Sequence, residues 1–253
     1  MQTRPMNDRY GDLDRPPLRA AALTRALEPD GWRVEVLEQA SSTNALVAER
    51  ARAGEAHGLV VVAEEQTAGR GRLDRRWVSP PRAGLTASVL LRPVEPWGWV
   101  PLLGGLAVAL AVREVAEVDA VLKWPNDVLV EGRKVCGLLA EVVEGAVVLG
   151  FGLNVTTRAD ELPVPEATSL ALAGATVTDR DTVLRAILRR LSGALGDRDV
   201  AGYRALCSTL GREVRVELPG GQSVTGLAER VDDEGRLVVD GTPYAAGDVV
   251  HLR

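Results

Sequence analysis

The sequence predicts an α+β protein in which a domain of mixed helices and strands precedes a smaller domain of β-strands. Through residue 208 the predicted strands and helices are interspersed, with a strand-rich block between residues 121 and 155. From Thr209 onward, short β-type runs are separated by Pro, Gly and Asp, a spacing that predicts a small barrel. We therefore expect domains at residues 18–208 and 209–253. Residues 1–17 are charged and contain prolines, which predicts a disordered tail.

Each predicted element follows from the spacing of its apolar residues and from the residues that end it. Alternation of apolar and polar residues indicates a strand, and recurrence every three or four residues indicates a helix. Ser42 or Thr43 is a suitable cap for the second helix, and Gly54 a suitable end. The expected segments are helices at 18–27, 43–52, 99–118, 178–195 and 200–206, and strands at 32–37, 59–63, 85–91, 121–124, 128–130, 135–143, 147–155, 214–218, 224–231, 236–240 and 249–253.

Composition and charge argue against several classes of function. The net charge of −5 and the isoelectric point near 5.3 provide no basic field that would attract nucleic acid. Cys136 and Cys207 lie far apart without a nearby His cluster, so we expect reduced thiols and no zinc site. No apolar stretch approaches about 18 residues, and the N-terminus lacks the apolar core of a signal peptide. We expect a cytoplasmic protein that contacts no membrane.

The stretch EEQTAGRGRLDRRW, at residues 64–77, is the main candidate for a functional loop. It follows the apolar run at 59–63, and such strands often carry functional residues where they end. Gly69 and Gly71 permit close approach of the backbone to a ligand, and the arginines between and after them suit phosphate or carboxylate oxygens. Because clustered arginines repel one another without an anion, we expect this loop to be mobile until ligand binds. By itself the stretch also fits a solvated basic loop or an RNA-binding tract.

Four further motifs surround this loop in the sequence. SSTN at 41–44 precedes it, whereas KWPND at 123–127, GRKVCGLLAE at 132–141 and GFGLN at 150–154 follow it. With the G-R-G-R stretch, and in this order, they resemble the catalytic domain of biotin protein ligases. The resemblance extends over about residues 32–253. It implies a mixed-sheet domain of the biotin/lipoate ligase type, related to class II aminoacyl-tRNA synthetases, with an SH3-like C-terminal β-barrel.

The resemblance also implies an activity. An enzyme of this family joins the carboxylate of biotin to a lysine of the biotin carboxyl carrier domain of a biotin-dependent carboxylase. ATP first converts the carboxylate to biotinyl-5′-AMP, and the lysine amine then displaces AMP. The first step needs fixed positive charge, together with Mg²⁺ on the phosphates. We expect the protein to be a monomer or a weak homodimer.

The resemblance assigns a role to each candidate residue. Lys134 is the expected main catalytic residue, helped by Arg70 and Arg72, and Asn126 and Asp127 are candidate Mg²⁺ ligands. The predicted biotin site comprises Ser42, Thr43, Asn44, Gln66, Arg70, Gly71, Arg72, Lys134, Gly137 and Gly152. The predicted ATP site comprises Arg72, Arg75, Trp77, Lys123, Asn126 and Asn154.

Several of these residues also have purely structural interpretations. The 42–44 segment is a plausible helix cap, 125–127 a plausible turn, and Lys134 a plausible solvated hairpin lysine. Leu73 and Asp74 depart from the commoner G-R-G-R-R-G pattern, which leaves the closing conformation of the loop open. The residues before the first expected strand are too few for a three-helix DNA-binding domain, so we expect no repressor role.

Three other functions remain as alternatives. A lipoate or octanoate ligase shares the fold and its lysine, although the R-G-R and KWPND motifs and the C-terminal barrel favour biotin. A nucleic-acid-binding module is disfavoured by the acidic isoelectric point and by an aromatic content of 4%. A non-catalytic nucleotide sensor is the third alternative.

Overall fold

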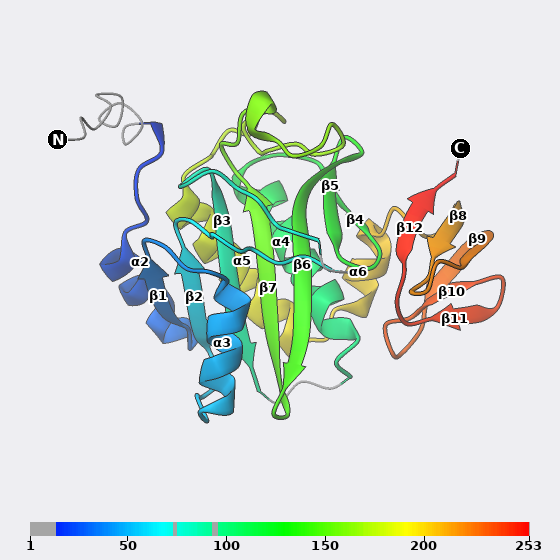
Figure 1. Cartoon of the computed structure of the whole chain (residues 1–253), viewed down its shortest axis with the longest axis horizontal. Helices are drawn as coiled ribbons and strands as arrows, with labels where there is room; N and C mark the ends of the chain where they lie inside the picture. Colours follow the sequence, from blue (N-terminus) through cyan, green and yellow to red (C-terminus); the bar gives the residue numbers. More distant parts are fainter. Residues whose placement is uncertain (1–13, 73–74, 93–95, 253) are drawn as a thin grey trace.

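The computed structural model describes residues 14–72, 75–92 and 96–252. Figure 1 shows a large sheet flanked by helices, with a small β unit beside it at the C-terminal end of the chain. This mixed architecture with a separate C-terminal sheet confirms the predicted fold class. Within the described ranges, no helix is both long and apolar enough to cross a membrane.

The large sheet has seven strands in the order β1-β2-β3-β7-β6-β5-β4. β1 pairs with β2 in parallel, whereas every other neighbouring pair is antiparallel, so the sheet is mixed. A tight turn at Glu131 and Gly132, both with positive φ, joins β5 to β6. The strands are β1 (Arg33–Leu37), β2 (Leu59–Ala63), β3 (Gly84–Leu91), β4 (Ala120–Lys123), β5 (Asp127–Val130), β6 (Arg133–Val143) and β7 (Ala146–Asn154).

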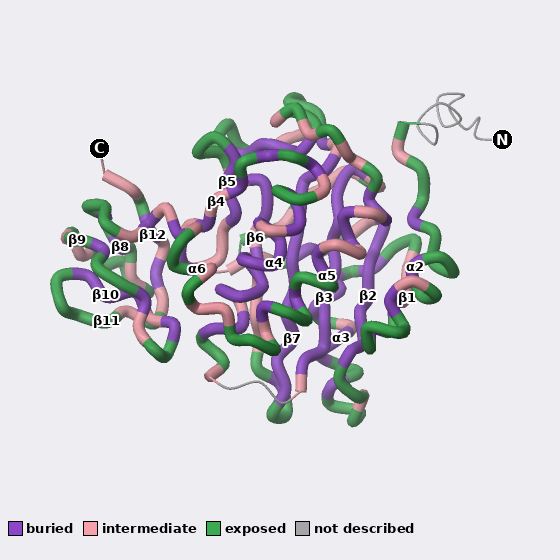
Figure 2. The backbone as a smooth tube through the Cα atoms, turned by 180° about the vertical axis from the view of Figure 1, so that it is seen from behind, coloured by how far each residue is buried: buried purple, intermediate pink, exposed green. Residues whose placement is uncertain are grey.

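Helices cover both faces of this sheet. Figure 1 shows α3 (Thr43–Arg52) in front of it, and Figure 2, from behind, shows α4 (Trp99–Val115) and α5 (Arg180–Gly196) on the other face. Both α4 and the central strands are largely buried, which places the core between them. α4 is shorter than the expected 99–118 because Glu117 adopts a positive φ that a helix cannot continue through. The remaining helical segments are α2 (Ala20–Leu27), α6 (Val200–Leu206) and the 3₁₀ turns η1 (Glu28–Asp30) and η2 (Ala159–Glu161).

The C-terminal unit is a five-stranded antiparallel sheet in the order β11-β10-β9-β8-β12. β11 was not predicted, because its three residues include Pro243, which cannot donate to a sheet ladder. β11 is an edge strand, where that missing donor is tolerated. The strands are β8 (Glu213–Glu217), β9 (Ser223–Val231), β10 (Leu237–Val239), β11 (Thr242–Tyr244) and β12 (Asp248–His251).

Two tryptophans of the larger unit are buried against the C-terminal sheet. Trp99 Nε1 donates to the Asp233 carbonyl at 3.0 Å, and Trp124 Nε1 donates to the Gly235 carbonyl at 3.1 Å. Each of the two residues is 1% exposed, so the contact is closely packed. These two hydrogen bonds attach the turn between β9 and β10 to the larger unit.

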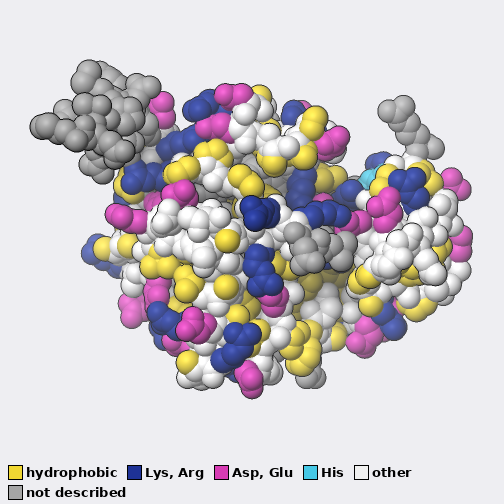
Figure 3. Space-filling model, viewed as in Figure 1, with side chains coloured by type: hydrophobic (Ala, Val, Ile, Leu, Met, Phe, Trp, Pro, Cys, Tyr) yellow, Lys and Arg dark blue, Asp and Glu magenta, His cyan; other side chains and the backbone are white. Residues whose placement is uncertain are grey.

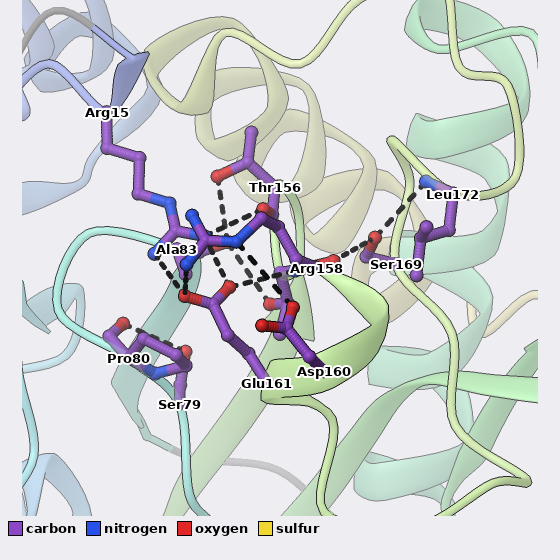
Figure 4. Close-up of polar contacts among 11 residues, drawn as sticks. Arg15, Ser79, Pro80, Ala83, Thr156, Arg158, Asp160, Glu161, Ser169 and Leu172 are labelled. Atoms are coloured by element: carbon purple, nitrogen blue, oxygen red, sulfur yellow. Dashed lines mark hydrogen bonds and ion pairs between the residues drawn. The ribbon is translucent and has the colours of Figure 1, made fainter. Parts of the chain in front are cut away.

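The segment just before α2 is attached to the large unit. Arg15 Nη2 contacts Glu161 Oε2 at 2.5 Å and donates to the Thr156 carbonyl at 3.0 Å, as Figure 4 shows. Both charged side chains are mostly buried, at 13% and 15% exposure. Residues 14–17 were expected to belong to the disordered tail, and the sequence did not suggest these contacts. The rest of that predicted tail, residues 1–13, lies outside the described residues.

A buried ion pair holds the start of the functional loop. Glu64 follows β2 directly, and its Oε2 lies 2.6 Å from Arg180 Nη1 at the start of α5. Glu64 Oε1 also accepts a hydrogen bond of 2.6 Å from the backbone N–H of Leu18. Because both charged groups are almost completely buried, removing either one would leave the other without its partner at high cost.

Candidate active site

The candidate site is a cavity of about 480 Å³ over the middle of the large sheet. The segment after β2 crosses in front of β7 and β6 at this position (Figure 1), and Lys and Arg side chains gather at the centre of the same face (Figure 3). Every predicted site residue except Lys123 lines the cavity. These residues are Ser42, Thr43, Asn44, Gln66, Arg70, Gly71, Arg72, Arg75, Trp77, Asn126, Asp127, Lys134, Gly137, Gly152 and Asn154.

The floor of the cavity is backbone without side chains. Gly137 of β6 and Gly152 of β7 are register partners, and Gly150 lies two residues away on the same face of β7. A methyl group on Gly152 would overlap the indole of Trp77, and one on Gly150 would overlap the amide of Asn44. At Gly137, a methyl group would come within 2.9 Å of Lys134 Nζ. Glycine is therefore required at Gly150 and Gly152, where other side chains lie directly over the backbone. At Gly137 a methyl group would displace the flexible end of the Lys134 side chain.

The start of α3 forms one end of the cavity. Ser42, one of the two expected caps, caps the helix, with Ala45 N donating to its hydroxyl oxygen at 3.4 Å. Gln66 Oε1 accepts a hydrogen bond of 2.8 Å from the backbone N–H of Thr43, which joins the loop after β2 to the helix start. Polar groups of this kind suit a small polar ring.

Asn44 is held by buried and partly buried neighbours that were not predicted to be site residues. Its Oδ1 lies 2.6 Å from the Ser88 hydroxyl, and its Nδ2 donates to Glu141 Oε2 at 2.8 Å. The Ser88 oxygen also lies 2.7 Å from Thr43 Oγ1. Ser88 is fully buried on β3, and no motif in the sequence pointed to it.

Backbone hydrogen bonds and two carboxylates hold the arginine loop. Trp77 N donates to the Gly69 carbonyl at 3.0 Å, which closes the loop at its base. Arg70 Nη1 lies 3.5 Å from Glu141 Oε1, and Arg75 forms an ion pair with Asp248 of β12. These carboxylates supply the anions that the clustered arginines require. Leu73 and Asp74, whose effect on loop closure the sequence left open, lie outside the described residues.

Arg72 reaches across the cavity to both units. Its Nη1 donates to Asn126 Oδ1 at 3.1 Å and to the carbonyl of Gly247 at 3.2 Å. Burial lowers the pKa of this guanidinium, although Asp127 opposes the shift. An arginine remains charged despite such a shift, so Arg72 presents a partly desolvated cation to the cavity.

Lys134 lies opposite the arginines. Its Nζ is 2.6 Å from Asp127 Oδ1, and its backbone pairs with the segment after η2 through Lys134 N→Glu166 O (2.7 Å) and Thr168 N→Lys134 O (2.8 Å). That segment also lines the cavity through Pro163, Val164 and Ala167, which the sequence did not mark as site residues. Lys134 is therefore fixed at both its backbone and its ammonium group.

Lys123 is the one predicted site residue that does not line the cavity. It ends β4, and its pKa is lowered by burial, although the charge of Asp127 opposes the shift. The described residues contain no cluster of three or more His, Cys, Asp or Glu side chains that could hold a metal ion. Asn126 and Asp127 nevertheless offer two neighbouring oxygen donors at the cavity wall.

Trp77 and Asn154 lie at the predicted nucleotide end. The Nε1 of Trp77 is buried and has no hydrogen-bond partner among the described residues. Asn154 is buried at the end of β7, and its Nδ2 donates to the Thr168 carbonyl at 2.9 Å. Asp248, from a strand far away in sequence, completes the wall beside Arg72 and Arg75. Only the packing of the two units brings it there.

Comparison with protein families matches both units of the chain. Residues 36–156 match the biotin/lipoate A/B protein ligase family, and residues 209–252 match the biotin protein ligase C-terminal domain. The biotin–[acetyl-CoA-carboxylase] ligase of Mycobacterium tuberculosis is 45% identical over 98% of this chain and 100% of that protein. The chain belongs to the biotin protein ligase family. The bifunctional ligase/repressor BirA of Escherichia coli is 30% identical to this ligase over 87% of the chain and 74% of BirA.

Solved structures show the same fold as this ligase. The Aquifex aeolicus biotin protein ligase in complex with biotin and ATP is 31% identical, with a TM-score of 0.75 over 87% of this chain and 99% of that one. The Leishmania major biotin protein ligase in complex with biotinyl-5-AMP is 27% identical, with a TM-score of 0.61 over 87% and 98% of the two chains. Together these comparisons support a biotin protein ligase over a lipoate ligase or a nucleic-acid-binding module.

Proposed function

We infer that this ligase uses ATP to attach biotin to a lysine of a carrier protein, the biotin carboxyl carrier domain of an acyl-CoA carboxylase. The observation that carries this inference is the cavity itself. A polar end at Thr43 and Gln66 is joined over a glycine floor to an end where Arg70, Arg72 and Lys134 converge. This arrangement suits a ligand with a polar ring at one end and a carboxylate at the other.

In the first step, a carboxylate oxygen of biotin attacks the α-phosphorus of ATP, and the bond to pyrophosphate breaks. Both reacting groups are anionic, so the barrier falls when fixed cations lie where charge accumulates. We assign Lys134 to the reacting carboxylate and α-phosphate. Arg70 and Arg72, from the opposite wall, are assigned to the carboxylate and phosphate oxygens.

Each of these cations is held by a protein oxygen in the structure. Lys134 contacts Asp127, Arg72 contacts Asn126, and Arg70 contacts Glu141. These contacts keep the cations oriented toward the cavity without a large rearrangement, which favours catalysis by positioning. Substrate oxygens then replace or share the protein oxygens.

Two of these oxygens, on Asn126 and Asp127, are also the proposed ligands of Mg²⁺. Asn126 Oδ1 and Asp127 Oδ1 already attract the cationic groups of Arg72 and Lys134. Hard oxygen donors beside a phosphate-binding wall fit an ion that retains most of its waters. Bound there, Mg²⁺ would neutralise phosphate charge. We therefore propose Asn126 and Asp127 as its protein ligands.

We propose Trp77 as the residue that packs against adenine and Asn154 as a polar contact of the nucleotide. Both lie on the cavity wall at the end of β7. Arg75 is assigned to the phosphates, whereas Lys123 does not line the cavity and would act through its charge. In the second step, the carrier lysine amine attacks the biotinyl carbonyl carbon, and AMP leaves.

The decisive experiment is the exchange of labelled pyrophosphate into ATP in the presence of biotin. We expect exchange that depends on biotin and is not supported by lipoate, followed by transfer of biotin to a purified carrier domain. Exchange with lipoate but not with biotin would favour the alternative ligase. The absence of exchange with either acid, in protein that binds ATP, would indicate a non-catalytic nucleotide sensor.

A further inference from the structure

A chain made of one ion pair and three hydrogen bonds runs along the cavity from the arginine loop to the start of α3. It links Arg70, Glu141, Asn44, Ser88 and Thr43, with successive contacts of 3.5, 2.8, 2.6 and 2.7 Å. The proposed catalytic steps use Glu141 only as the partner of Arg70, and they do not use Ser88. Their role is therefore a separate question, although its answer rests on the proposed function for the identity of the ligand.

The hydrogen bonds of this chain have one direction, because its second member, Glu141, is a carboxylate. Glu141 accepts hydrogen bonds and has none to donate, so the Asn44 side chain must present its amide nitrogen to Glu141. The same amide nitrogen lies 3.4 Å from the Leu139 carbonyl, a second acceptor. Asn44 Oδ1 must then face Ser88 as an acceptor.

The orientation of the Asn44 amide determines to which oxygen the Ser88 and Thr43 hydroxyls donate their protons. Each hydroxyl carries one proton, and that of Ser88 must be donated to Asn44 Oδ1. Ser88 then accepts from Thr43, whose oxygen lies 2.7 Å away, so the Thr43 proton is directed away from the cavity. Gln66 Oε1 accepts the Thr43 backbone N–H and lies 3.2 Å from Thr43 Oγ1, so it is a second acceptor within reach of the Thr43 proton. The Ser88 oxygen is 0.5 Å closer and has no proton left to donate to Thr43, so we assign the Thr43 proton to Ser88.

Two acceptor oxygens thus lie side by side at the ring end of the cavity. A ligand group placed between them must donate a hydrogen bond, since a second acceptor would leave buried oxygens opposed and unsatisfied. We propose that Glu141 and Ser88 are positioning residues that set Thr43 as an acceptor and so select a ligand ring bearing an N–H donor. The cyclic urea of biotin has such donors, whereas the dithiolane ring of lipoate has none.

Packing keeps the chain in this arrangement. Ser88 is fully buried, and Asn44 is 5% exposed above Gly150, where any larger residue would overlap its amide. Arg70 balances the charge of Glu141. Rotation of Asn44 by 180° would place its amide nitrogen against Ser88 and its oxygen against the Glu141 carboxylate, which is unfavourable.

The test compares variants of the chain with matched controls away from it. Ser88→Ala and Glu141→Gln each alter one member of the hydrogen-bond chain with little change in side-chain volume. Thr86→Val removes a buried hydroxyl two residues from Ser88 on the same strand, one that donates to the Ala63 carbonyl instead. Glu114→Gln removes a carboxylate paired with Arg190 on the outer face of α4. Titration calorimetry would measure the binding of biotin and of its two analogues methylated at one urea nitrogen or the other.

We expect Ser88→Ala to weaken biotin binding by about tenfold or more, with kcat nearly unchanged, because one buried hydrogen-bond arrangement is lost. For the analogue that lacks the N–H facing Thr43, the same substitution should have less than about a twofold effect. The controls should bind biotin as the wild type does. Equal weakening for biotin and both analogues would show a merely structural role and overturn the proposal.

A measurement without ligand separates this proposal from the proposed function. In the wild type, the side-chain amide protons of Asn44 should exchange slowly with solvent, and Glu141→Gln should change their NMR shifts while Glu114→Gln should not. If the NMR shifts of the Asn44 amide protons are unchanged in Glu141→Gln, the proposed hydrogen-bond chain is wrong, even if the enzyme is fully active. A wild-type protein that binds no biotin would instead overturn the proposed function, and with it the ligand assigned here.

Discussion

Lys134 Nζ lies 2.6 Å from Asp127 Oδ1, and the two residues come from neighbouring antiparallel strands. The lysine side chain extends over Gly137, so its ammonium group is held above the bare floor of the cavity. An exposed lysine would lose conformational freedom on binding substrate. The contact with Asp127 reduces that loss because the ammonium group is already placed.

The first prediction concerns this lysine. Lys134→Ala should lower the rate of biotin-dependent pyrophosphate exchange by about 10²-fold or more, because one preorganised cation is removed from the transition state. Arg189→Ala removes an exposed cation on α5, paired with Asp30, and should leave the rate unchanged. Circular dichroism should be the same for both variants. A Lys134→Ala enzyme with near-normal exchange would contradict the catalytic assignment.

The second prediction concerns the floor. Gly152→Ala should weaken ATP binding, because the added methyl group would displace Trp77 from its place over β7. Gly193→Ala is the matched control, since nothing lies within 4 Å of its added methyl group in α5. That control should raise helix stability by about 0.5–1 kcal/mol and leave the KM for ATP unchanged. An unchanged KM for ATP in Gly152→Ala would remove Trp77 from the nucleotide site.

The third prediction concerns how the stability of the fold depends on pH. Burial lowers the pKa of His251 from 6.5 to about 4. Trp124 N donates to Thr209 Oγ1 at 3.1 Å, so the Thr209 proton is free to be donated to His251 Nε2, also at 3.1 Å. Protonation of that nitrogen would break this hydrogen bond.

The unfolded chain therefore binds a proton that the folded chain excludes between pH 6.5 and about 4. The stability contributed by His251 is present above pH 6.5 and is lost as the pH falls through this window. We expect the melting temperature of His251→Gln to fall less steeply with acidification than that of the wild type. His57, whose pKa burial also lowers, accounts for a remaining slope that His57→Gln should reduce. Parallel curves for wild type and His251→Gln would refute this account.

The fourth prediction concerns the contact between the two units. Asp248 is paired with Arg75 and lies 4.0 Å from Arg72, so it neutralises the loop in the absence of ligand. Asp248→Asn should increase tryptic cleavage after these arginines, and biotin with ATP should restore protection. Asp240→Asn, on an exposed turn of the same sheet, is the control for a lost carboxylate. Cleavage that is the same in Asp248→Asn and wild type would show that the loop is held by its backbone alone.

Much of the fold was predictable because its helices and strands follow clear local sequence patterns. The strand at β2 formed as predicted, and Ser42, one of the two expected caps, begins α3. β11 was missed because proline disfavours a strand by local rules, whereas an edge position in a sheet removes that objection. Edge position is a tertiary property, which local patterns do not contain.

The site was predictable where its residues belong to motifs, and not where packing alone brings them in. Ser88 looks like an ordinary small residue in a strand, and Asp248 lies in the other unit. Lys123 belongs to the KWPND motif, yet it ends β4 outside the cavity wall. The roles of the motif residues in binding biotin, ATP and Mg²⁺ stay predictions, as do the limits of the two domains.

The glycine floor limits how the pocket could be enlarged for bulkier biotin analogues. At Gly137, Gly150 and Gly152 there is no side chain to shorten, and every substitution adds atoms where Lys134, Asn44 or Trp77 already lies. The pocket can therefore be enlarged only by substituting side chains of its walls. Asn44, Lys134 and Trp77 each have another assigned role. Val164 is a wall residue without one, and it is about half exposed. Shortening the Val164 side chain would widen the pocket and leave the assigned groups in place.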